Sequence, residues 1–172
     1  MVSHAARGPR RSRRVVPAVL AVLVVVLGFV WLRVGGELAA ARAEAGDRRA
    51  AVRAAERYAL GLMAVDYRTI DRDVRRVLDT STGQARQEYA GEAGRLKSVT
   101  VRHKAIQTGV VRAAGLAAMD GARRTARVLV VADSVIRWDG ARTAPQERFH
   151  RWSIEVTKVG GSWWVSRLEQ VS

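Results

Sequence analysis

Three histidines are the first candidates for metal or acid–base chemistry, because histidine titrates near neutral pH. His4 lies near the N-terminus, and no recognisable metal-ligand pattern surrounds His103 or His150. Ser162 and Ser166 have no histidine partner in the order that a nucleophilic triad requires. The chain has no cysteine, which excludes thiolate metal sites and disulfides. We therefore expect no metal, no cofactor and no triad, and we expect His103 and His150 to be exposed strand residues.

Aromatic side chains form a second group of candidates, because they can line a ligand pocket or fill a core. The candidates for pocket or partner contacts are Tyr58, Tyr89, Trp138, Trp152, Trp163 and Trp164. Trp163 and Trp164 are adjacent, so on a strand they would point to opposite faces and one would lie outside the core. Both interpretations remain open: packing between sheet and helices, or a pocket for an acyl chain or sterol.

An uncharged run of eighteen residues extends from Val15 to Leu32, after five arginines in the first fourteen positions. As a helix it would be about 27 Å long, close to the hydrocarbon thickness of a bilayer. Thirteen of its residues are Val, Leu or Phe, and their insertion would contribute about 4–8 kcal/mol. We predict a transmembrane helix over residues 15–34. Its anchor residues are Val15, Leu20, Leu23, Leu27, Phe29, Trp31 and Leu32.

Two kinds of export signal compete with a permanent anchor. A cleaved signal peptide usually has an apolar stretch of about 7–15 residues, and the small-x-small site at Ala39–Ala41 lies well beyond this run. Residues 12–16 also resemble a twin-arginine signal, which Pro17 and the high hydrophobicity fit less well. The arginines before the run are denser than those after it. The positive-inside rule therefore favours a cytoplasmic N-terminus and an extracytoplasmic C-terminal part.

The net charge of +14 raises the question of a nucleic-acid partner. Residues 50–172 contain 21 basic and 13 acidic side chains, a surplus of 8. The basic residues are scattered among acids and few aromatic residues interleave with them, so we expect no nucleic-acid binding. The arginine-rich tail at residues 1–14 is better suited to acidic lipid headgroups.

Helical signals continue after the apolar run. Residues 35–50 are rich in Ala and Arg and lack an apolar face, which favours a solvated stalk with Gly35–Gly36 as a hinge. An apolar stripe with helical spacing follows at Val52, Ala55, Ala59, Leu62 and Val65. Thr69, followed by acidic residues at positions 71 and 73, has the pattern of a helix N-cap and predicts a second helix. A third helix is predicted over residues 84–97.

From Ser98 onward the apolar period changes to two. The predicted strands cover residues 99–119, 124–138, 147–158 and 162–171. Gly109 and Gly115 are expected bulge or bend points in the first strand. Turns are predicted at Asp120–Gly121, Asp139–Gly140 and Gly160–Gly161. The strand at residues 124–138 is apolar on both faces, which favours a central position in the sheet.

This order of elements predicts an α+β protein. An N-terminal transmembrane helix would precede about three helices packed on one face of a curved four-stranded antiparallel sheet. The predicted divisions are a cytoplasmic tail (1–14), a transmembrane helix (15–34), a stalk (35–50) and an extracytoplasmic α+β domain (51–172). About 140 residues after the span suffice for one domain with a core, and not for two.

Four stretches, in this order, resemble the Mce-associated membrane proteins of actinobacteria, which are encoded beside mammalian cell entry (Mce) lipid transporters. They are AERYALGLMAVDY (Ala55–Tyr67), Thr82–Gly83 followed by Tyr89, DGARRTARVLVVAD (Asp120–Asp133) and GGSWWVSRLEQV (Gly160–Val171). The resemblance covers about residues 15–172 and departs from the family at Ala85, where a Phe is expected. It implies a membrane helix carrying a cone-shaped domain of the nuclear transport factor 2-like superfamily.

The resemblance further implies a non-enzymatic accessory subunit that stabilises or assembles an Mce-type lipid or sterol import complex. The implied partners are the membrane, Mce transporter subunits and lipid. A type IV secretion assembly factor, similar in anchor and fold, is the main alternative, and a lipid-carrying domain is another. Cone-shaped domains also include isomerases, for which Asp66, Tyr67, Tyr58 and Asp133 would supply a carboxylate base and a hydroxyl donor. We expect no enzyme, because a fold alone does not imply its chemistry.

Overall fold

The computed structural model describes residues 12–171, except for the side chains of residues 12–19, 21, 30 and 34. Most of the predicted tail and the side chain of the predicted anchor residue Val15 therefore lie outside the described part. The chain divides into two compact units between Ala43 and Glu44. We call the part before this boundary unit 1 and the part after it unit 2, and each is described by itself.

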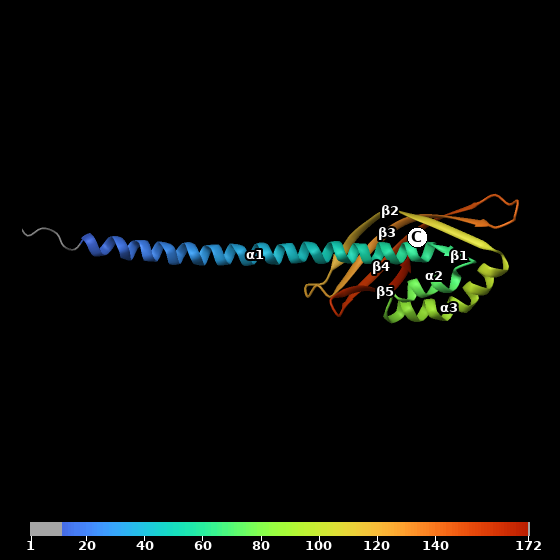
Figure 1. Ribbon diagram of the computed structural model, residues 1–172, viewed down its shortest axis with the longest axis horizontal. Coiled ribbons are helices and arrows are strands. Elements are labelled where there is room, and N and C mark those ends of the chain that lie inside the picture. Colours follow the sequence, from blue (N-terminus) through green and yellow to red (C-terminus); the bar gives the residue numbers. More distant parts are fainter. Residues whose placement is uncertain (1–11, 172) are drawn as a thin grey trace, which may run out of the picture. The chain divides into compact units, whose positions relative to one another are not determined.

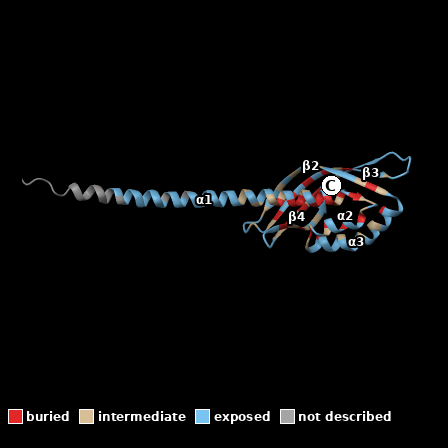
Figure 2. Ribbon diagram, viewed as in Figure 1, coloured by how far each residue is buried: buried red, intermediate tan, exposed pale blue. Residues whose placement is uncertain are grey.

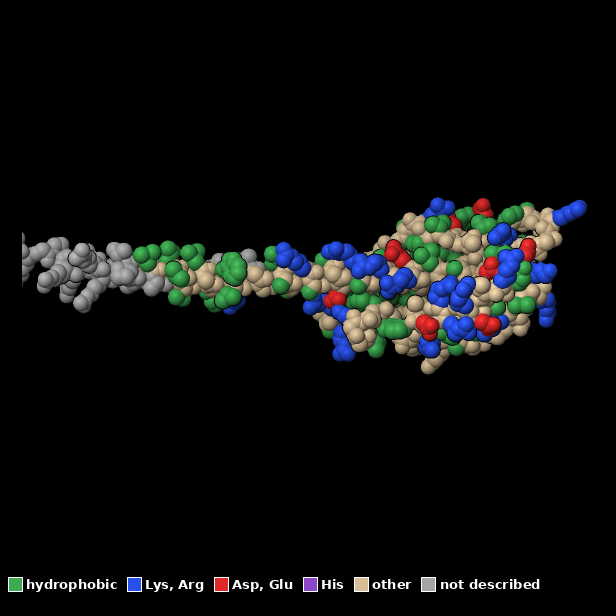
Figure 3. Space-filling view, viewed as in Figure 1, with side chains coloured by type: hydrophobic (Ala, Val, Ile, Leu, Met, Phe, Trp, Pro, Cys, Tyr) green, Lys and Arg blue, Asp and Glu red, His purple; other side chains and the backbone are tan. Residues whose placement is uncertain are grey.

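The described part of unit 1, residues 12–43, is a single stretch of helix. Helix α1 extends from Ser12 to Met63, and its residues up to Ala43 belong to unit 1. Gly35 and Gly36 continue the helix, so the predicted hinge is wrong; a helical glycine costs only about 1 kcal/mol relative to alanine. Figure 3 shows the apolar side chains of this stretch, which are exposed at Leu20, Leu23, Leu27, Phe29, Trp31 and Leu32. Among the described helices, α1 is the one long and apolar enough to cross a membrane.

Unit 2 is built on a curled antiparallel sheet whose strand order follows the sequence (Figure 1). The strands are β1 (Val65–Asp66), β2 (Ala105–Met119), β3 (Thr125–Trp138), β4 (Gln146–Val159) and β5 (Ser162–Gln170). Helices α2 (Ile70–Leu78) and α3 (Gly83–Arg102) and the last part of α1 pack on its concave face. The predicted α+β class is confirmed, with β3 at the centre of the sheet.

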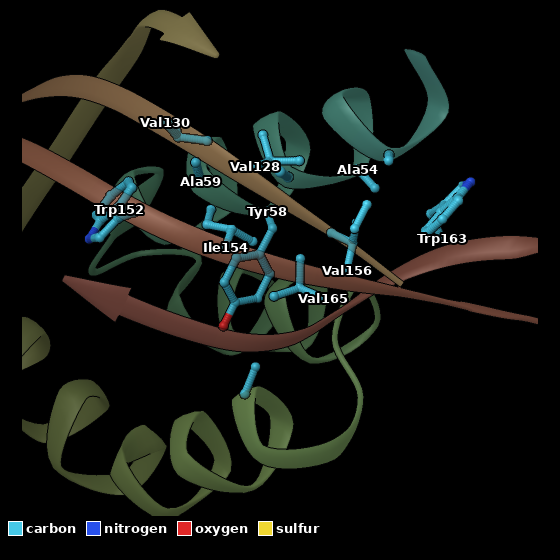
Figure 4. Close-up of a cluster of buried hydrophobic side chains, with 14 of the residues drawn as sticks. Ala54, Tyr58, Ala59, Val128, Val130, Trp152, Ile154, Val156, Trp163 and Val165 are labelled. Atoms are coloured by element: carbon cyan, nitrogen blue, oxygen red, sulfur yellow. The ribbon is translucent and has the colours of Figure 1, made fainter. Parts of the chain in front are cut away.

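The core of unit 2 lies between α1 and the concave face of the sheet (Figures 2 and 4). On α1 the buried residues recur with helical spacing at Ala51, Ala54, Ala55, Tyr58, Ala59 and Met63. On β3 and β4 alternate residues are buried, namely Ala126, Val128, Val130, Ala132, Trp152, Ile154 and Val156. The alanines bring α1 close to the strands, and each buried Val or Ile contributes roughly 1.5–3 kcal/mol.

Two element boundaries differ from the sequence prediction. The sheet has five strands and not four, because β1 pairs with Ile106 and Gln107 and a strand of two residues has no alternating pattern to detect. Residues 99–102, predicted to begin a strand, instead end α3. Their β-branched side chains disfavour a helix only weakly, and burial of Thr100 in unit 2 outweighs that preference.

The glycines of β2 do not mark its bulges. The register between β2 and β3 shifts at Arg112 and Ala117, whereas Gly109 and Gly115 pair regularly, so the predicted bulge positions are wrong. Gly109 instead permits a close approach of the helix. A Cβ atom at this position would lie 2.5 Å from the Sδ atom of Met63.

The predicted turns are present. Asp120 Oδ1 accepts hydrogen bonds from the backbone N–H groups of Arg124 and Thr125 at 2.7 and 2.9 Å, and these bonds hold the pKa of Asp120 below its usual value. Gly140, Gly160 and Gly161 adopt the positive φ angles that favour glycine. Beside the β4–β5 turn, Lys158 Nζ lies 2.6 Å from Asp47 Oδ1. This ion pair ties α1 to the sheet where the chain enters unit 2.

Candidate functional site

Tyr58 lies at the centre of the core. Its side chain is 1% exposed, and Figure 4 shows its ring beside Ile154 and Val165. Burial raises the pKa of the Tyr58 hydroxyl to about 12, and nearby Tyr89 and Glu88 act in the same direction. Its position is that of a packing residue.

The tryptophans divide between the core and its margin. Trp152 and Trp163 are buried in the core cluster, whereas Trp138 and Trp164 are half-buried. Burial alternates along β5, so the adjacent Trp163 and Trp164 lie on opposite faces. Trp164 is on the outer face, opposite Thr157 of β4, where part of its ring is open to a partner.

A polar cluster that sequence reasoning missed lies on the concave face. Ser134 Oγ accepts a hydrogen bond from Gln107 Nε2 at 3.0 Å and lies 2.9 Å from His150 Nε2. The His150 ring stacks on Trp152, with 4.6 Å between ring centroids. Burial lowers the pKa of His150, and the nearby charge of Arg148 lowers it further. His150 is therefore not the exposed strand residue we predicted. It lies two residues before Trp152, so on a strand the two side chains point to the same face, and this spacing was the signal available in the sequence.

The Ser134–His150 pair resembles a buried structural hydrogen bond more than a nucleophile with its base. Ser134 is 1% exposed, which closes its hydroxyl to a substrate. Among the described side chains, no carboxylate is hydrogen-bonded to His150 to orient its ring. His103 ends α3 as its C-cap residue and is exposed, but on a helix end and not on a strand as predicted.

The groups considered for carboxylate and hydroxyl chemistry lie apart from one another. Asp133 is on the outer face of β3, where its Oδ2 lies 2.6 Å from Arg112 Nε. Asp66 Oδ1 accepts the backbone N–H of Arg68 at 2.8 Å and so closes the turn before α2. Tyr58 is enclosed in the core. Of three hollows in unit 2, one is lined in part by Tyr67, and none of the three is lined by Asp66, Asp133 or Tyr58.

Tyr67 takes part in polar contacts that join the segment before α2 to the sheet. Its hydroxyl donates to Asp139 Oδ2 at 2.7 Å, and Arg68 Nη2 lies 2.5 Å from the same carboxylate. The hydrogen bond raises the pKa of Tyr67 and lowers the pKa of Asp139. This arrangement holds the segment before α2 against the end of β3.

Two hollows on unit 2 are open to solvent. One, of about 470 Å³, is lined by Glu92, Arg95, Leu96 and Val99 of α3. Another, of about 380 Å³, lies near Tyr67 and the start of α2. Within residues 12–171, no three His, Asp or Glu side chains gather closely enough to hold a metal ion.

The outer face of the sheet exposes a group of apolar side chains. We define the outer-face patch as Val110 of β2, Leu129, Val131 and Val135 of β3, and Phe149 of β4. The register places Val110 and Phe149 on either side of Asp133, so three neighbouring strands contribute, and Phe149 is 74% exposed. The apolar outer side of β3 was visible in the sequence, but the contributions of β2 and β4 were not recognised.

Solved structures share the fold of unit 2. The periplasmic domain of DotI matches with a TM-score of 0.59 and 11% identity, over 70% of this chain and 91% of that chain. An IcmL-like type IV secretion system protein from Legionella pneumophila matches with 0.57 and 12%, over 70% and 88%. Agrobacterium tumefaciens VirB8 matches with 0.56 and 13%, over 73% and 92%. At these identities the likeness shows the fold alone.

Sequence similarity extends over nearly the whole chain. Uncharacterized protein Rv1363c of Mycobacterium tuberculosis (strain ATCC 25618 / H37Rv) is 32% identical over 159 residues, which are 90% of this chain and 59% of that protein. The chain therefore spans well under two thirds of this relative's length. The family model described as "Uncharacterized protein Rv1363c/MT1408-like" matches residues 15–172. The chain belongs to this Rv1363c/MT1408-like family, which has a member in an actinobacterium.

Proposed function

We propose that the protein is a membrane-anchored, non-enzymatic accessory subunit that stabilises or assembles an Mce-type lipid or sterol import complex. In this proposal the apolar part of α1 spans the membrane and unit 2 lies outside the cytosol. The observation that carries the proposal is the outer-face patch: a sheet whose concave face is covered by helices leaves apolar side chains open on its other face. Exposed apolar side chains gathered on one face mark protein interaction sites, and here they surround the Arg112–Asp133 ion pair.

Three further features support an interaction role. The candidate catalytic groups are engaged in ion pairs, turns or core packing. The two described hollows are open to solvent, which suits a closed lipid-carrying cavity poorly. An anchor would confine unit 2 to the membrane plane and raise its effective concentration near its partners, so that modest contacts would suffice.

A type IV secretion-like assembly role is the second candidate. The solved structures that share the fold include an IcmL-like type IV secretion system protein and the periplasmic domain of DotI. Identities of 11–13% leave the choice between the two roles to experiment.

Affinity purification of the full-length protein from native membranes tests the proposal. The wild type should recover Mce transporter subunits. Leu129→Asp or Val131→Asp should reduce that recovery roughly tenfold or more, because an unpaired charge added to the apolar part of an interface costs well over 1 kcal/mol. Val159→Asp is the matched control, since Val159 is also exposed but lies outside the patch at the end of β4.

The outcomes separate the candidate roles. Recovery of secretion-system components in place of transporter subunits would favour the second role. Co-purification of a stoichiometric lipid with the isolated chain would favour a carrier. Equal recovery with the patch variants and the control would contradict the assignment of the outer-face patch.

A further inference from the structure

The hollow of about 380 Å³ near the start of α2 is rich in arginine. Arg68 comes from the segment before α2, and Arg72 and Arg75 come from α2 itself. The volume lies in the range of about 300–1,000 Å³ that is typical of small-molecule sites. The hollow belongs entirely to unit 2, and the other side chains that line it are those of Tyr67, Thr69, Ile70, Asp71 and Val101.

Two of the three arginines have no carboxylate partner. Arg68 is paired with Asp139 at 2.5 Å and more distantly with Asp66 at 3.8 Å. Among the described residues, no carboxylate forms an ion pair with Arg72 or Arg75, and both side chains are exposed. They lie three positions apart on a helix, where neighbouring side chains meet and like charges repel. One anion between the two guanidinium groups would relieve that repulsion.

The acidic side chain of the hollow, Asp71, is neutralised by a residue of α3. Lys97 Nζ lies 2.6 Å from Asp71 Oδ1. This contact lowers the pKa of Asp71, and the nearby charge of Arg75 lowers it further. Because Asp71 and Lys97 cancel, the charge of the hollow that is left without a partner is that of Arg72 and Arg75.

The hollow also has an apolar side. Ile70 forms part of its lining and is 5% exposed, whereas Val101, in the last turn of α3, is 50% exposed. Val101 therefore offers hydrocarbon contact in the same hollow as the two free guanidinium groups. This combination suits an anionic group that is attached to an organic body.

A phosphate group matches the two unpaired arginines better than a carboxylate does. A phosphate monoester carries a charge of about −1.5 to −2 at pH 7 and has three strong acceptor oxygens. Each planar guanidinium can donate two parallel hydrogen bonds to such oxygens. A carboxylate has one charge and two oxygens, which a single arginine can occupy.

We propose that this hollow binds a phosphate group, which Arg72 and Arg75 hold, on a ligand whose organic part packs beside Val101. The phosphate belongs to a lipid headgroup or to a soluble phosphate ester, because both present the same chemical group. The site shares no residue with the outer-face patch and does not depend on the accessory role. Recovery of transporter subunits and binding of phosphate can therefore fail separately.

NMR of isoleucine methyl groups tests the proposal with the full chain in neutral detergent micelles. The sequence contains four isoleucines, of which Ile70 lines the hollow, and Ile70→Val assigns its signal. Inorganic phosphate should shift the Ile70 signal saturably, whereas Ile136 and Ile154 on the sheet serve as internal controls. No saturable shift of Ile70, or an equal shift with sodium chloride at the same ionic strength, would overturn the proposal.

Acetate tests whether the site prefers phosphate. With one charge and two oxygens, acetate should bind roughly fivefold or more weakly than inorganic phosphate near neutral pH. Equal affinities for the two anions would contradict the assignment of the site to a phosphate group.

Paired substitutions test the two arginines. The double variant Arg72→Gln/Arg75→Gln should weaken the binding of inorganic phosphate roughly tenfold or more, because it removes both charged donors. The matched control is Arg53→Gln/Arg57→Gln, since these arginines are also exposed and one turn apart, but lie on α1 outside the hollow. Equal weakening by the two pairs would indicate a general effect of net charge and would contradict the site.

Asp71→Asn provides a variant with the opposite effect. It removes the negative charge of the hollow and should strengthen the binding of inorganic phosphate about two- to fivefold. A loss of folding would not produce this gain, so the test holds even if the double arginine variant does not fold. Unchanged or weaker binding by Asp71→Asn would contradict the proposal.

Two further titrations of the wild type distinguish the sources of the phosphate. Glycerol phosphate is the soluble probe, and phosphatidic acid added to the micelles is the lipid probe, with phosphatidylcholine as its control. A shift of Ile70 that saturates at a lower concentration of phosphatidic acid would identify a lipid headgroup. Saturation at a lower concentration of glycerol phosphate would identify a soluble ester, and no shift with either probe would overturn the proposal.

Discussion

The hydroxyl of Tyr58 makes the stability of unit 2 sensitive to alkaline pH. Burial raises its pKa from 10.0 to about 12, so above pH 10 the unfolded chain loses this proton before the folded one does. The stability contributed by the neutral hydroxyl is complete below pH 10 and is lost as the pH rises toward 12. Absorbance titration should show one of the three tyrosines ionising near pH 12.

Tyr58→Phe should remove that late ionisation and flatten the fall of unfolding free energy between pH 10 and 12. Tyr67→Phe is the control, because Tyr67 is hydrogen-bonded to Asp139 and lies outside the core. An unchanged late ionisation in Tyr58→Phe would contradict the assignment.

For the aromatic residues and for His150, the sequence did not specify which side chains would be their neighbours. The aromatic side chains of Tyr58, Trp152 and Trp163 were expected either to fill a core or to line a pocket. In the structure they pack among the other buried residues of the core cluster. His150 was assigned to solvent because its partner Ser134 lies on another strand. A hydrogen bond across a sheet depends on register, which local sequence patterns do not specify.

At the scale of elements, α1 can approach β2 closely because residue 109 is a glycine and has no side chain. Gly109→Ala would place a Cβ 2.5 Å from Met63 Sδ and 2.6 Å from Met63 Cβ, and the helix end would have to move. We expect a loss of about 1–3 kcal/mol in unfolding free energy, as for an overpacked core. Gly115→Ala in the same strand meets nothing within 4 Å and should change stability by less than about 1 kcal/mol. Urea unfolding of the full chain in detergent measures both, and equal stabilities would contradict the close approach.

Helices and turns were predicted well where the cause was local. Thr69 precedes α2 as expected, and glycines with positive φ occupy the turns at residues 140 and 160–161. The end of α3 was predicted too early because the β-branched residues 99–101 favour a strand in isolation, whereas burial of Thr100 in unit 2 favours the helix. Tertiary burial outweighs a propensity difference of a few tenths of a kcal/mol.

At the scale of the whole molecule, the membrane proposal predicts opposite accessibility for the two ends of the chain. The absence of cysteine allows single labels at Ser3→Cys, in the arginine-rich tail, and at Ala141→Cys, in the β3–β4 connection. In intact cells, a membrane-impermeant maleimide should label Ala141→Cys and should label Ser3→Cys only after lysis, because charged reagents do not cross a bilayer. The reverse pattern would overturn the orientation. A labelled product shortened by about the length of the tail and the apolar run together would indicate a cleaved signal.

The sequence by itself determined the apolar segment, the order of helices before strands and most turns. Each of these follows from local composition and periodicity, which constrain the backbone within a few neighbouring residues. Only the tertiary structure decided which faces and hollows remain open. The outer-face patch combines residues from Val110 to Phe149, and the arginine-rich hollow combines residues from Tyr67 to Val101. Long-range pairing and packing decide what is left uncovered, and no local pattern records them.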